Sequence, residues 1–233
     1  MYKIFMEKRV IVFSLGGSLI VPDIVDYKYL HKFKLFVNNL SRKYKIVIVT
    51  GGGKTARNYI EGLKKEKAGD VFYSLVGIMA TKLNARLVGG IFNMKGNIPD
   101  TLHEVRRQLS KNNIVVCGAL GFRPNMTSDG NAASVAEYLK AEVFVNLTNV
   151  DGLYDKDPRK YKNLKLIRRV SYTDFLNRVN KIKYEAGQHF VLDQAAAKII
   201  LKSRIKTLIM NGNKLDNLVK YLHGNNFTGT IVG

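Results

Sequence analysis

The stretch that most constrains the fold is an apolar, β-branched run that breaks into three glycines and continues with helical spacing. Residues 47–57 read VIVTGGGKTAR. Adjacent glycines allow positive φ and let an anion approach the backbone amides. A helix N-terminus directs free N–H groups and positive partial charge at the same point. The stretch predicts a strand, turn and helix that cradle a phosphate, with a plain tight turn as the alternative. Its spacing is neither that of a Walker A loop nor that of the dinucleotide fingerprint.

Apolar and amphipathic segments alternate along the rest of the chain in the same way. Buried strands are expected at 9–15, 45–50, 113–117, 143–147 and 205–210, with an edge strand at 228–232. Helical spacing predicts helices at 27–44, 54–67, 72–89, 101–111, 131–140, 171–180, 192–203 and 214–223. Strands that alternate with helices predict an α/β fold in which a mostly parallel sheet is covered on both faces.

Four glycine-rich or polar loops follow predicted strands. They are the turn Gly16-Gly17-Ser18, the triple glycine, and the loops at 127–129 and 148–157. Ligands of open α/β sheets bind beyond the carboxyl ends of the strands. We therefore expect the four loops to converge on one cleft, where two anion cradles face hydroxyls and carboxylates.

Composition sets the class of protein. With 233 residues, of which 46% are hydrophobic, the chain can bury the core of one large domain, with or without two lobes. Its single cysteine, Cys117, excludes an internal disulfide and a cysteine zinc site, and indicates a buried thiol in a reducing cytoplasm. The N-terminus has no secretory pattern, and no run is expected to be long enough to span a membrane.

The formal net charge is +20. Because the lysines are spread through every helix and no basic run is interleaved with aromatics, a lysine-rich solvated surface is the favoured explanation, and nucleic acid is not required. A basic phosphate site or incidental RNA affinity is the alternative. The four histidines lack metal-ligand spacing, and no metal site is expected from protein residues alone.

Basic residues beside the glycines suit phosphoryl transfer, which depends on charge neutralisation and in-line positioning. Lys54 and Arg57 follow the triple glycine, and the planar guanidinium of Arg57 matches phosphate oxygens. A solvated helix arginine is the alternative for Arg57.

Polar residues of the later loops complete the predicted site. Asp129 would organise the cations or Mg²⁺, or cap the following helix. Thr127 and Ser128 offer hydroxyls to an acceptor phosphate or nucleoside. Tyr154 would lie against a purine, and Asp157 would bind ribose hydroxyls or an exocyclic nitrogen.

Two of the carboxylates in this half of the chain also have simpler explanations. A plain β-turn at Asp151-Gly152 explains part of the loop at 148–157, though not its whole set of polar groups. Asp193, which precedes a predicted helix, is expected to be its N-cap.

An ordered set of motifs then covers almost the whole chain. In order, they are Gly16-Gly17-Ser18, residues 51–60, Thr81-Lys82-Leu83-Asn84-Ala85, Thr127-Ser128-Asp129, residues 148–154, Asp157-Pro158, Glu185-Ala186-Gly187, Leu192-Asp193, residues 196–200 and Gly229-Thr230. Together they resemble the amino acid kinase superfamily and, within it, the archaeal-type uridylate kinases.

The resemblance implies a three-layer α/β sandwich around a sheet of about eight strands, as a single domain over residues 1–233. It implies transfer of the γ-phosphoryl group of ATP to UMP, dependence on Mg²⁺, and a homohexamer. The lobe at about 1–111 would serve the acceptor, the phosphates and oligomerisation. The lobe at about 112–233 would serve ATP.

The resemblance also implies roles for individual residues. Catalysis would rest on Arg57, Lys54 and Asp129. ATP would contact Gly17, Ser18, Gly53, Arg57, Thr148, Asn149, Tyr154 and Asp157. UMP would contact Gly52, Ser74, Phe122, Arg123, Pro124, Asn125, Met126, Thr127 and Ser128.

Three positions depart from the family pattern. Ser14 stands where many members carry a lysine, so Arg57, Lys54 or a metal would supply the positive charge. Ser74 stands where the family places the acidic residue that binds the UMP ribose. The acceptor loop reads PNMTSDGN over residues 124–131, after a short insertion. The ATP half of the pattern is therefore the more complete one.

Three hypotheses follow. The first is a cytoplasmic kinase that makes UDP from UMP and ATP. The second keeps the fold and the ATP site but uses another small phosphate or carboxylate as acceptor. The third is a catalytically weak nucleotide-binding regulatory protein whose basic surface binds RNA.

Overall fold

Seven strands form the central sheet of the computed structural model, which describes residues 8–121, 126–156, 158, 161, 163–181 and 192–233. All neighbouring pairs are parallel except β8–β9. In sheet order the strands are β3 (Ile114–Cys117), β2 (Lys45–Thr50), β1 (Val10–Leu15), β4 (Val143–Thr148), β8 (Thr207–Asn211), β9 (Thr230–Val232) and β7 (Arg169–Val170). This confirms the mostly parallel α/β sheet, with seven strands in the described residues where about eight were expected.

The central strands are buried on both faces, which explains their continuous β-branched sequences. In β1, Ile11 and Phe13 belong to one core cluster and Val12 to the other. Leu15 pairs with Thr50 of β2 and with Leu147 of β4. The glycine turns that follow β1 and β2 therefore leave the sheet at the same level.

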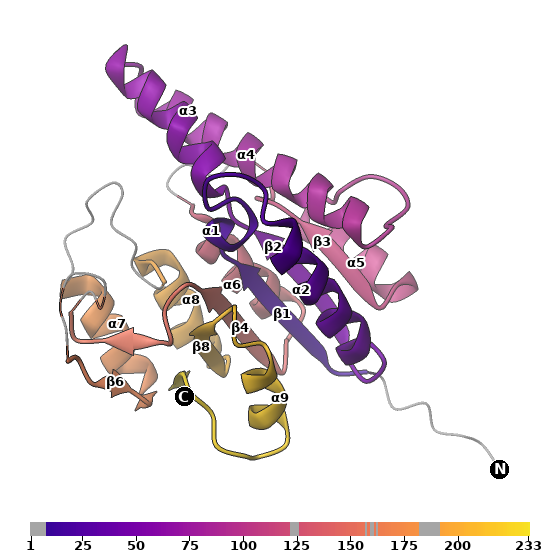
Figure 1. Ribbon diagram of the computed structural model, residues 1–233, viewed down its shortest axis with the longest axis vertical. Coiled ribbons are helices and arrows are strands. Elements are labelled where there is room, and N and C mark those ends of the chain that lie inside the picture. Colours follow the sequence, from indigo (N-terminus) through magenta and orange to yellow (C-terminus); the bar gives the residue numbers. More distant parts are fainter. Residues whose placement is uncertain (1–7, 122–125, 157, 159–160, 162, 182–191) are drawn as a thin grey trace.

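Helices cover both faces of the sheet and make the predicted three-layer sandwich (Figure 1). One face packs against α1 (Gly17–Ile20), α2 (Tyr27–Leu40), α4 (Asp70–Ile91) and α9 (Asp216–Leu222). The other packs against α5 (Leu102–Lys111), α6 (Ser128–Tyr138), α7 (Tyr172–Lys181) and α8 (Gln194–Ser203). A further helix, α3 (Gly53–Lys65), buries none of its residues and lies along α4; in Figure 1 both project beyond the sheet.

The small residues of α6 let it lie deep in the molecule. Every residue from 130 to 136 is buried, and the segment reads GNAASVA. Short side chains permit a close approach to the sheet and to α8. The N-terminus of α6 is thereby carried to the carboxyl ends of β1 and β2.

The C-terminal strand corrects one prediction. Residues 228–232 were expected to form an edge strand, but β9 lies between β8 and β7. The two-residue β7 forms that edge instead. A segment so short and so basic carries no strand periodicity that a sequence pattern could reveal. A separate hairpin pairs β5 (Leu153–Tyr154) with β6 (Leu166–Ile167).

A second correction concerns α4. By length and composition it is the one described helix that could cross a membrane, so the expectation that no run is long enough was wrong. Its sequence is apolar because one face packs on the sheet through residues such as Ala85 and Val88. Its buried polar residues, Thr81 and Asn84, bond to loops at the end of the sheet. These contacts are those of a helix that packs on a protein core.

Candidate active site

The two glycine turns meet backbone to backbone. A Cβ on Gly17 would lie 2.0 Å from the nitrogen of Gly53 and 2.8 Å from the carbonyl carbon of Gly51. Gly53 has a φ of +64°, and a Cβ there would lie 2.4 Å from the oxygen of Gly17. Only glycine fits such a contact, so the predicted convergence of these two turns is confirmed.

Free amides are restricted to part of each turn. The N–H of Gly16 donates to Leu147 and that of Gly51 to Leu15, so neither can bind an anion. Lys54 likewise donates its backbone N–H to Val21. Within the described part of the chain, the N–H groups of Gly17, Ser18, Gly52 and Gly53 have no acceptor. These four donors belong to the residues predicted to contact ATP and UMP.

The N-terminus of α6 stands opposite the turns. Thr127 is its N-cap, and the hydroxyl oxygen accepts from the N–H of Gly130 at 3.1 Å. The alternative that made Asp129 the cap is therefore wrong, because the helix begins at Ser128, ahead of the predicted start at 131. The Ser128 hydroxyl lies 3.5 Å from the position that a Cβ on Gly51 would take. Ser128 thus faces the triple-glycine turn.

Asp129 points at the first strand. The hydroxyl of Ser14 donates to Oδ1 of Asp129 at 2.8 Å, and Ser14 is 1% exposed. Burial raises the pKa of Asp129 to about 7, the charge of Asp193 adds to the rise, and the Ser14 hydrogen bond opposes it. Ser14, which stands where the family carries a lysine, thus positions this carboxylate without neutralising it.

Asp193 connects α8 to α6. It caps α8 by accepting from the N–H of Ala196 at 2.8 Å, as predicted, and it accepts a hydrogen bond from the Thr127 hydroxyl. Burial raises the pKa of Asp193, while the amides of Ala196, Ala195 and Gly130 act in the opposite direction. The two carboxylates, Asp129 and Asp193, therefore share one poorly solvated corner.

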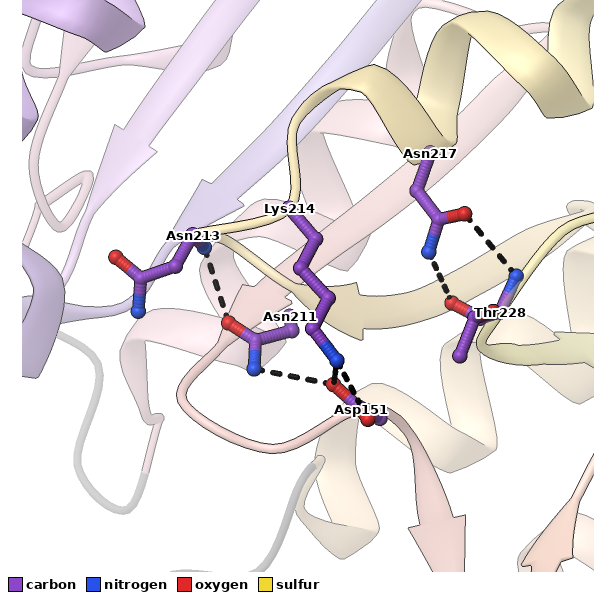
Figure 2. A network of polar contacts seen from close by, with 6 residues as sticks. All are labelled: Asp151, Asn211, Asn213, Lys214, Asn217 and Thr228. Atoms are coloured by element: carbon purple, nitrogen blue, oxygen red, sulfur yellow. Dashed lines mark hydrogen bonds and ion pairs between the residues drawn. The ribbon is translucent and has the colours of Figure 1, made fainter.

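The loop after β4 is fixed by the turn after β8 (Figure 2). Asp151 accepts from Nδ2 of Asn211 at 3.1 Å and from Nζ of Lys214 at 2.8 and 2.9 Å. The oxygen of Thr148 accepts from the N–H of Gly212 at 2.8 Å. Burial and the Asp151 charge raise the pKa of Tyr154, and Lys214 opposes them. Thr148 and Tyr154 thus mark the two ends of one anchored loop.

Helix α4 supports the triple-glycine turn and the end of β3 through two buried polar residues that were not among the predicted site residues. Nδ2 of Asn84 donates to the oxygen of Gly51 at 2.7 Å, and the hydroxyl of Thr81 accepts from the N–H of Ala119 at 2.9 Å. The hydroxyl of Thr50 donates to the oxygen of Thr81 at 2.9 Å. The sequence signal for Thr81 and Asn84 was a polar residue within an apolar helix, because such a residue needs a hydrogen-bond partner when it is buried. Both residues lie in the motif Thr81–Ala85.

Among the described residues, neither predicted cation has a strong partner. Lys54 lies 3.9 Å from Asp23, an exposed and weak ion pair, and Arg57, partly buried in the second turn of α3, has none. Ser74 lies on α4, one turn before Gly77, whose oxygen is 3.7 Å from the Cβ position of Gly52. Both cations and Ser74 thus belong to the helices next to the turns.

Some predicted residues cannot be placed. Phe122, Arg123, Pro124, Asn125 and Asp157 lie outside the described residues. Of the remaining predictions, Met126 precedes the Thr127 cap with its sulfur beside Gly130, and Asn149 is exposed just after β4.

Magnesium is compatible with this donor set. No group of three or more His, Cys, Asp or Glu side chains suited to a metal occurs in the described residues. Mg²⁺ bound with a nucleotide needs only one or two carboxylates, because phosphates and water complete its octahedron. Asp129 is bonded to Ser14 near the end of β1 and follows Ser128, which faces the triple-glycine turn, so it is the carboxylate that fits this role.

Comparison with known proteins agrees with the geometry. The profile of the amino acid kinase family matches residues 9–211. The uridylate kinase of Methanococcus aeolicus is 37% identical over 95% of this chain and 98% of its own, and that of Pyrococcus abyssi is 36% identical over the same shares. The crystal structure of uridylate kinase from Archaeoglobus fulgidus superposes with a TM-score of 0.82, at 33% identity, over 96% of this chain and 99% of that one. The fold, the paired glycine turns and these matches along nearly the whole length show that the chain belongs to the amino acid kinase family.

Proposed function

We propose that this protein is a uridylate kinase, which transfers the γ-phosphoryl group of ATP to UMP and releases ADP and UDP. The observation that carries the proposal is the backbone contact between the two glycine turns, which leaves four amides without an acceptor among the described residues, next to the N-terminus of α6. Uridylate kinases more than 30% identical to the chain over nearly its whole length support the same reaction.

The two substrates occupy the two sides of these turns in our proposal. The γ-phosphoryl and β-phosphoryl oxygens lie at the amides of Gly17, Ser18 and Gly53, and the ATP ribose and base reach the loop of Thr148, Asn149 and Tyr154. UMP lies at Gly52, Ser74 and residues 122–128. The N-terminal lobe, at about 1–111, then serves mainly the acceptor and the phosphates, and the C-terminal lobe, at about 112–233, mainly ATP.

Charge stabilisation supplies most of the catalysis in a phosphoryl transfer. Arg57 and Lys54 bring positive charge from the first turns of α3. Asp129 would hold Mg²⁺, which neutralises phosphate charge when it is bound. Ser14 fixes the orientation of the Asp129 carboxylate through its hydrogen bond.

An assay of ADP release against a panel of acceptors tests this proposal. We expect turnover with UMP to exceed turnover with CMP, dUMP and small carboxylates. Ser74 lacks the second oxygen with which a carboxylate accepts bidentately from a ribose, so another acceptor is the specific competing function. Faster turnover with a different acceptor would reassign the substrate. No turnover with any acceptor, together with salt-sensitive RNA binding, would favour the regulatory protein.

We further propose that the enzyme assembles as a homohexamer in the cytoplasm, where UMP and ATP are found. Phe72, Leu75, Met79 and Leu83 recur every three or four residues on one face of α4, and all four are exposed. An exposed apolar stripe of this kind marks an interaction surface, and an identical helix can cover it across a two-fold axis.

A further inference from the structure

An ion pair joins two loops that are far apart in the sequence. Lys214 lies in the turn between β8 and α9, and its Nζ contacts both carboxylate oxygens of Asp151, at 2.8 and 2.9 Å. Figure 2 shows both polar groups, from Lys214 and Asn211, reaching Asp151 from the same turn. Partial burial acts to raise the pKa of Asp151, but the hydrogen bonds from Lys214 and Asn211 and the charge of Lys214 lower it overall.

The turn that carries Lys214 is held by hydrogen bonds of its own. Oδ1 of Asn211 accepts from the N–H of Asn213 at 3.0 Å, and the N–H of Lys214 donates to the oxygen of Asn211 at 3.0 Å. Gly212 is wedged beside Leu19, whose Cδ1 would lie 2.4 Å from a Cβ. Leu19 belongs to α1 and follows the first glycine turn directly. Its contact with Gly212 therefore places the turn that carries Lys214 next to the proposed phosphate site.

The start of α9 is anchored from the other side. Nδ2 of Asn217 donates to the oxygen of Thr228 at 2.6 Å, and Oδ1 of Asn217 accepts from the N–H of Thr228 at 3.2 Å (Figure 2). The segment that carries Lys214 is therefore held on both sides. The contact between Lys214 and Asp151 in turn sets the position of the loop of residues 148–154.

Asp151 lies midway between two proposed ATP contacts. Thr148 precedes it and Tyr154 follows it, in a loop whose far end is held when the N–H of Leu153 donates to the Thr230 hydroxyl at 2.8 Å. Between those ends, the described side-chain contacts of Asp151 are those with Asn211 and Lys214. The course of the loop beside Tyr154 therefore depends on the contact between Asp151 and Lys214.

We propose that Lys214 is a positioning residue for ATP, which acts through Asp151 to hold the loop of residues 148–154 in its nucleotide-binding form. The inference rests on the proposed placement of ATP. The Lys214 side chain is 53% exposed and that of Asp151 27% exposed, and exposed pairs add little to global stability. The pair therefore contributes to preorganisation of the loop rather than to folding.

Kinetics of the full-length Lys214→Met variant test the proposal. We expect KM for ATP to rise by about 10-fold, with kcat and KM for UMP within about 2-fold of the parent, because the lost contact orders only the ATP loop. Lys214→Arg, which keeps a cation within reach of Asp151, should restore most of the ATP affinity. Lys220→Met is the matched control, since Lys220 is an exposed lysine of α9, and it should leave all three constants unchanged.

A double-mutant cycle separates an indirect role from a direct one. Asp151→Asn should reproduce the effect of Lys214→Met, and the double variant should be no worse than either single change. Additive losses, or an unchanged KM for ATP, would overturn the proposal. Titration with a fluorescent ATP analogue measures nucleotide affinity without turnover, so a failure of UMP as acceptor stays distinguishable from a failure of the Lys214 assignment.

Discussion

At the scale of single residues, the candidate site contains a carboxylate whose surroundings disfavour its charged form. Asp129 is partly buried, near Asp193, and receives one hydrogen bond, from Ser14. No cationic side chain of the described residues is among the groups that shift its pKa, so Asp129 is partly protonated near neutral pH and a bound cation would favour its charged form. The residue that we propose to hold Mg²⁺ therefore lowers the stability of the free protein.

Asp129→Asn tests this trade-off through pH. The folded protein holds the Asp129 proton up to a pH of about 7, whereas the unfolded chain releases it near 4, so this group's contribution to stability is full below 4 and is lost as the pH rises through 7. Asn accepts the Ser14 hydrogen bond without charge. In urea unfolding with EDTA, we expect the variant to be more stable than the parent by on the order of 2–4 kcal/mol at pH 8 and by much less at pH 5. Equal stability at pH 8 would contradict the raised pKa.

Arg57 supplies the clearest test of the positive charge that we propose to stabilise the transition state. Without a carboxylate partner in the described chain, its guanidinium is available to a phosphate. Arg57→Ala should lower kcat by about 10²-fold or more, with a smaller effect on KM for ATP, because the charge matters most in the transition state. Lys64→Ala, in the last turn of the same helix, is the control. Unchanged kcat and KM would remove Arg57 from the mechanism.

Tyr29 offers a prediction about stability alone. Its hydroxyl is buried and has no hydrogen-bond partner among the described residues. Tyr29→Phe should leave the free energy of unfolding unchanged or raise it by about 1 kcal/mol, because an unsatisfied polar group is removed from the core. Tyr172→Phe, which deletes a hydroxyl that donates to the oxygen of Arg204 at 2.8 Å, should lower stability slightly. A marked loss for Tyr29→Phe would show that its hydroxyl has a partner.

At the scale of elements, the decisive contact joins the turn after β1 to the start of α3. Neither turn could approach the other with a side chain at Gly17, because a Cβ there would fall on the Gly53 backbone. Three further elements surround this contact: α6 brings Ser128, α4 braces Gly51 through Asn84, and the turn after β8 fixes the loop of residues 148–154, where we propose that ATP binds.

Gly17→Ala should separate the turns. We expect it to destabilise the protein by more than about 2 kcal/mol and to lower ATP affinity, because backbone rather than a flexible side chain must move. Gly62→Ala is the opposite case: Gly62 lies exposed in α3 with open space around its Cβ position, and alanine there should add about 0.5–1 kcal/mol. Thermal melts and nucleotide titration of both variants test this contrast. If Gly17→Ala changed neither the stability nor the ATP affinity, the predicted role of the contact between the turns would be refuted.

At the scale of the whole molecule, α4 connects the site to the proposed assembly surface. One side of the helix holds the glycine turn through Asn84, and the other exposes Met79 and Leu83 to 64% and 59%. The whole chain carries a net charge of +20, which attracts anionic nucleotides, and salt weakens this attraction.

Charged substitutions on this stripe test the assembly. Met79→Glu combined with Leu83→Glu should reduce the mass measured by light scattering, because carboxylates cannot be buried unpaired between two helices. Leu35→Glu, at a similarly exposed position of α2, should keep the parent mass. An unchanged mass for the α4 variant would place the contact elsewhere.

The sequence by itself determined six strands (β1, β2, β3, β4, β8 and β9), most helix boundaries and the two glycine turns, because β-branched runs, helical periodicity and glycine act over a few residues. The ordered motifs added the family. Only the tertiary structure decided that β9 is internal, that Thr127 rather than Asp129 caps α6, that the amides of Gly16 and Gly51 are already bonded, and that Lys214 meets Asp151. The cap depends on where α6 begins, and helix boundaries are what a local pattern places least well. The other three features depend on partners from distant segments, and a local pattern does not say which distant group will satisfy a donor or a charge.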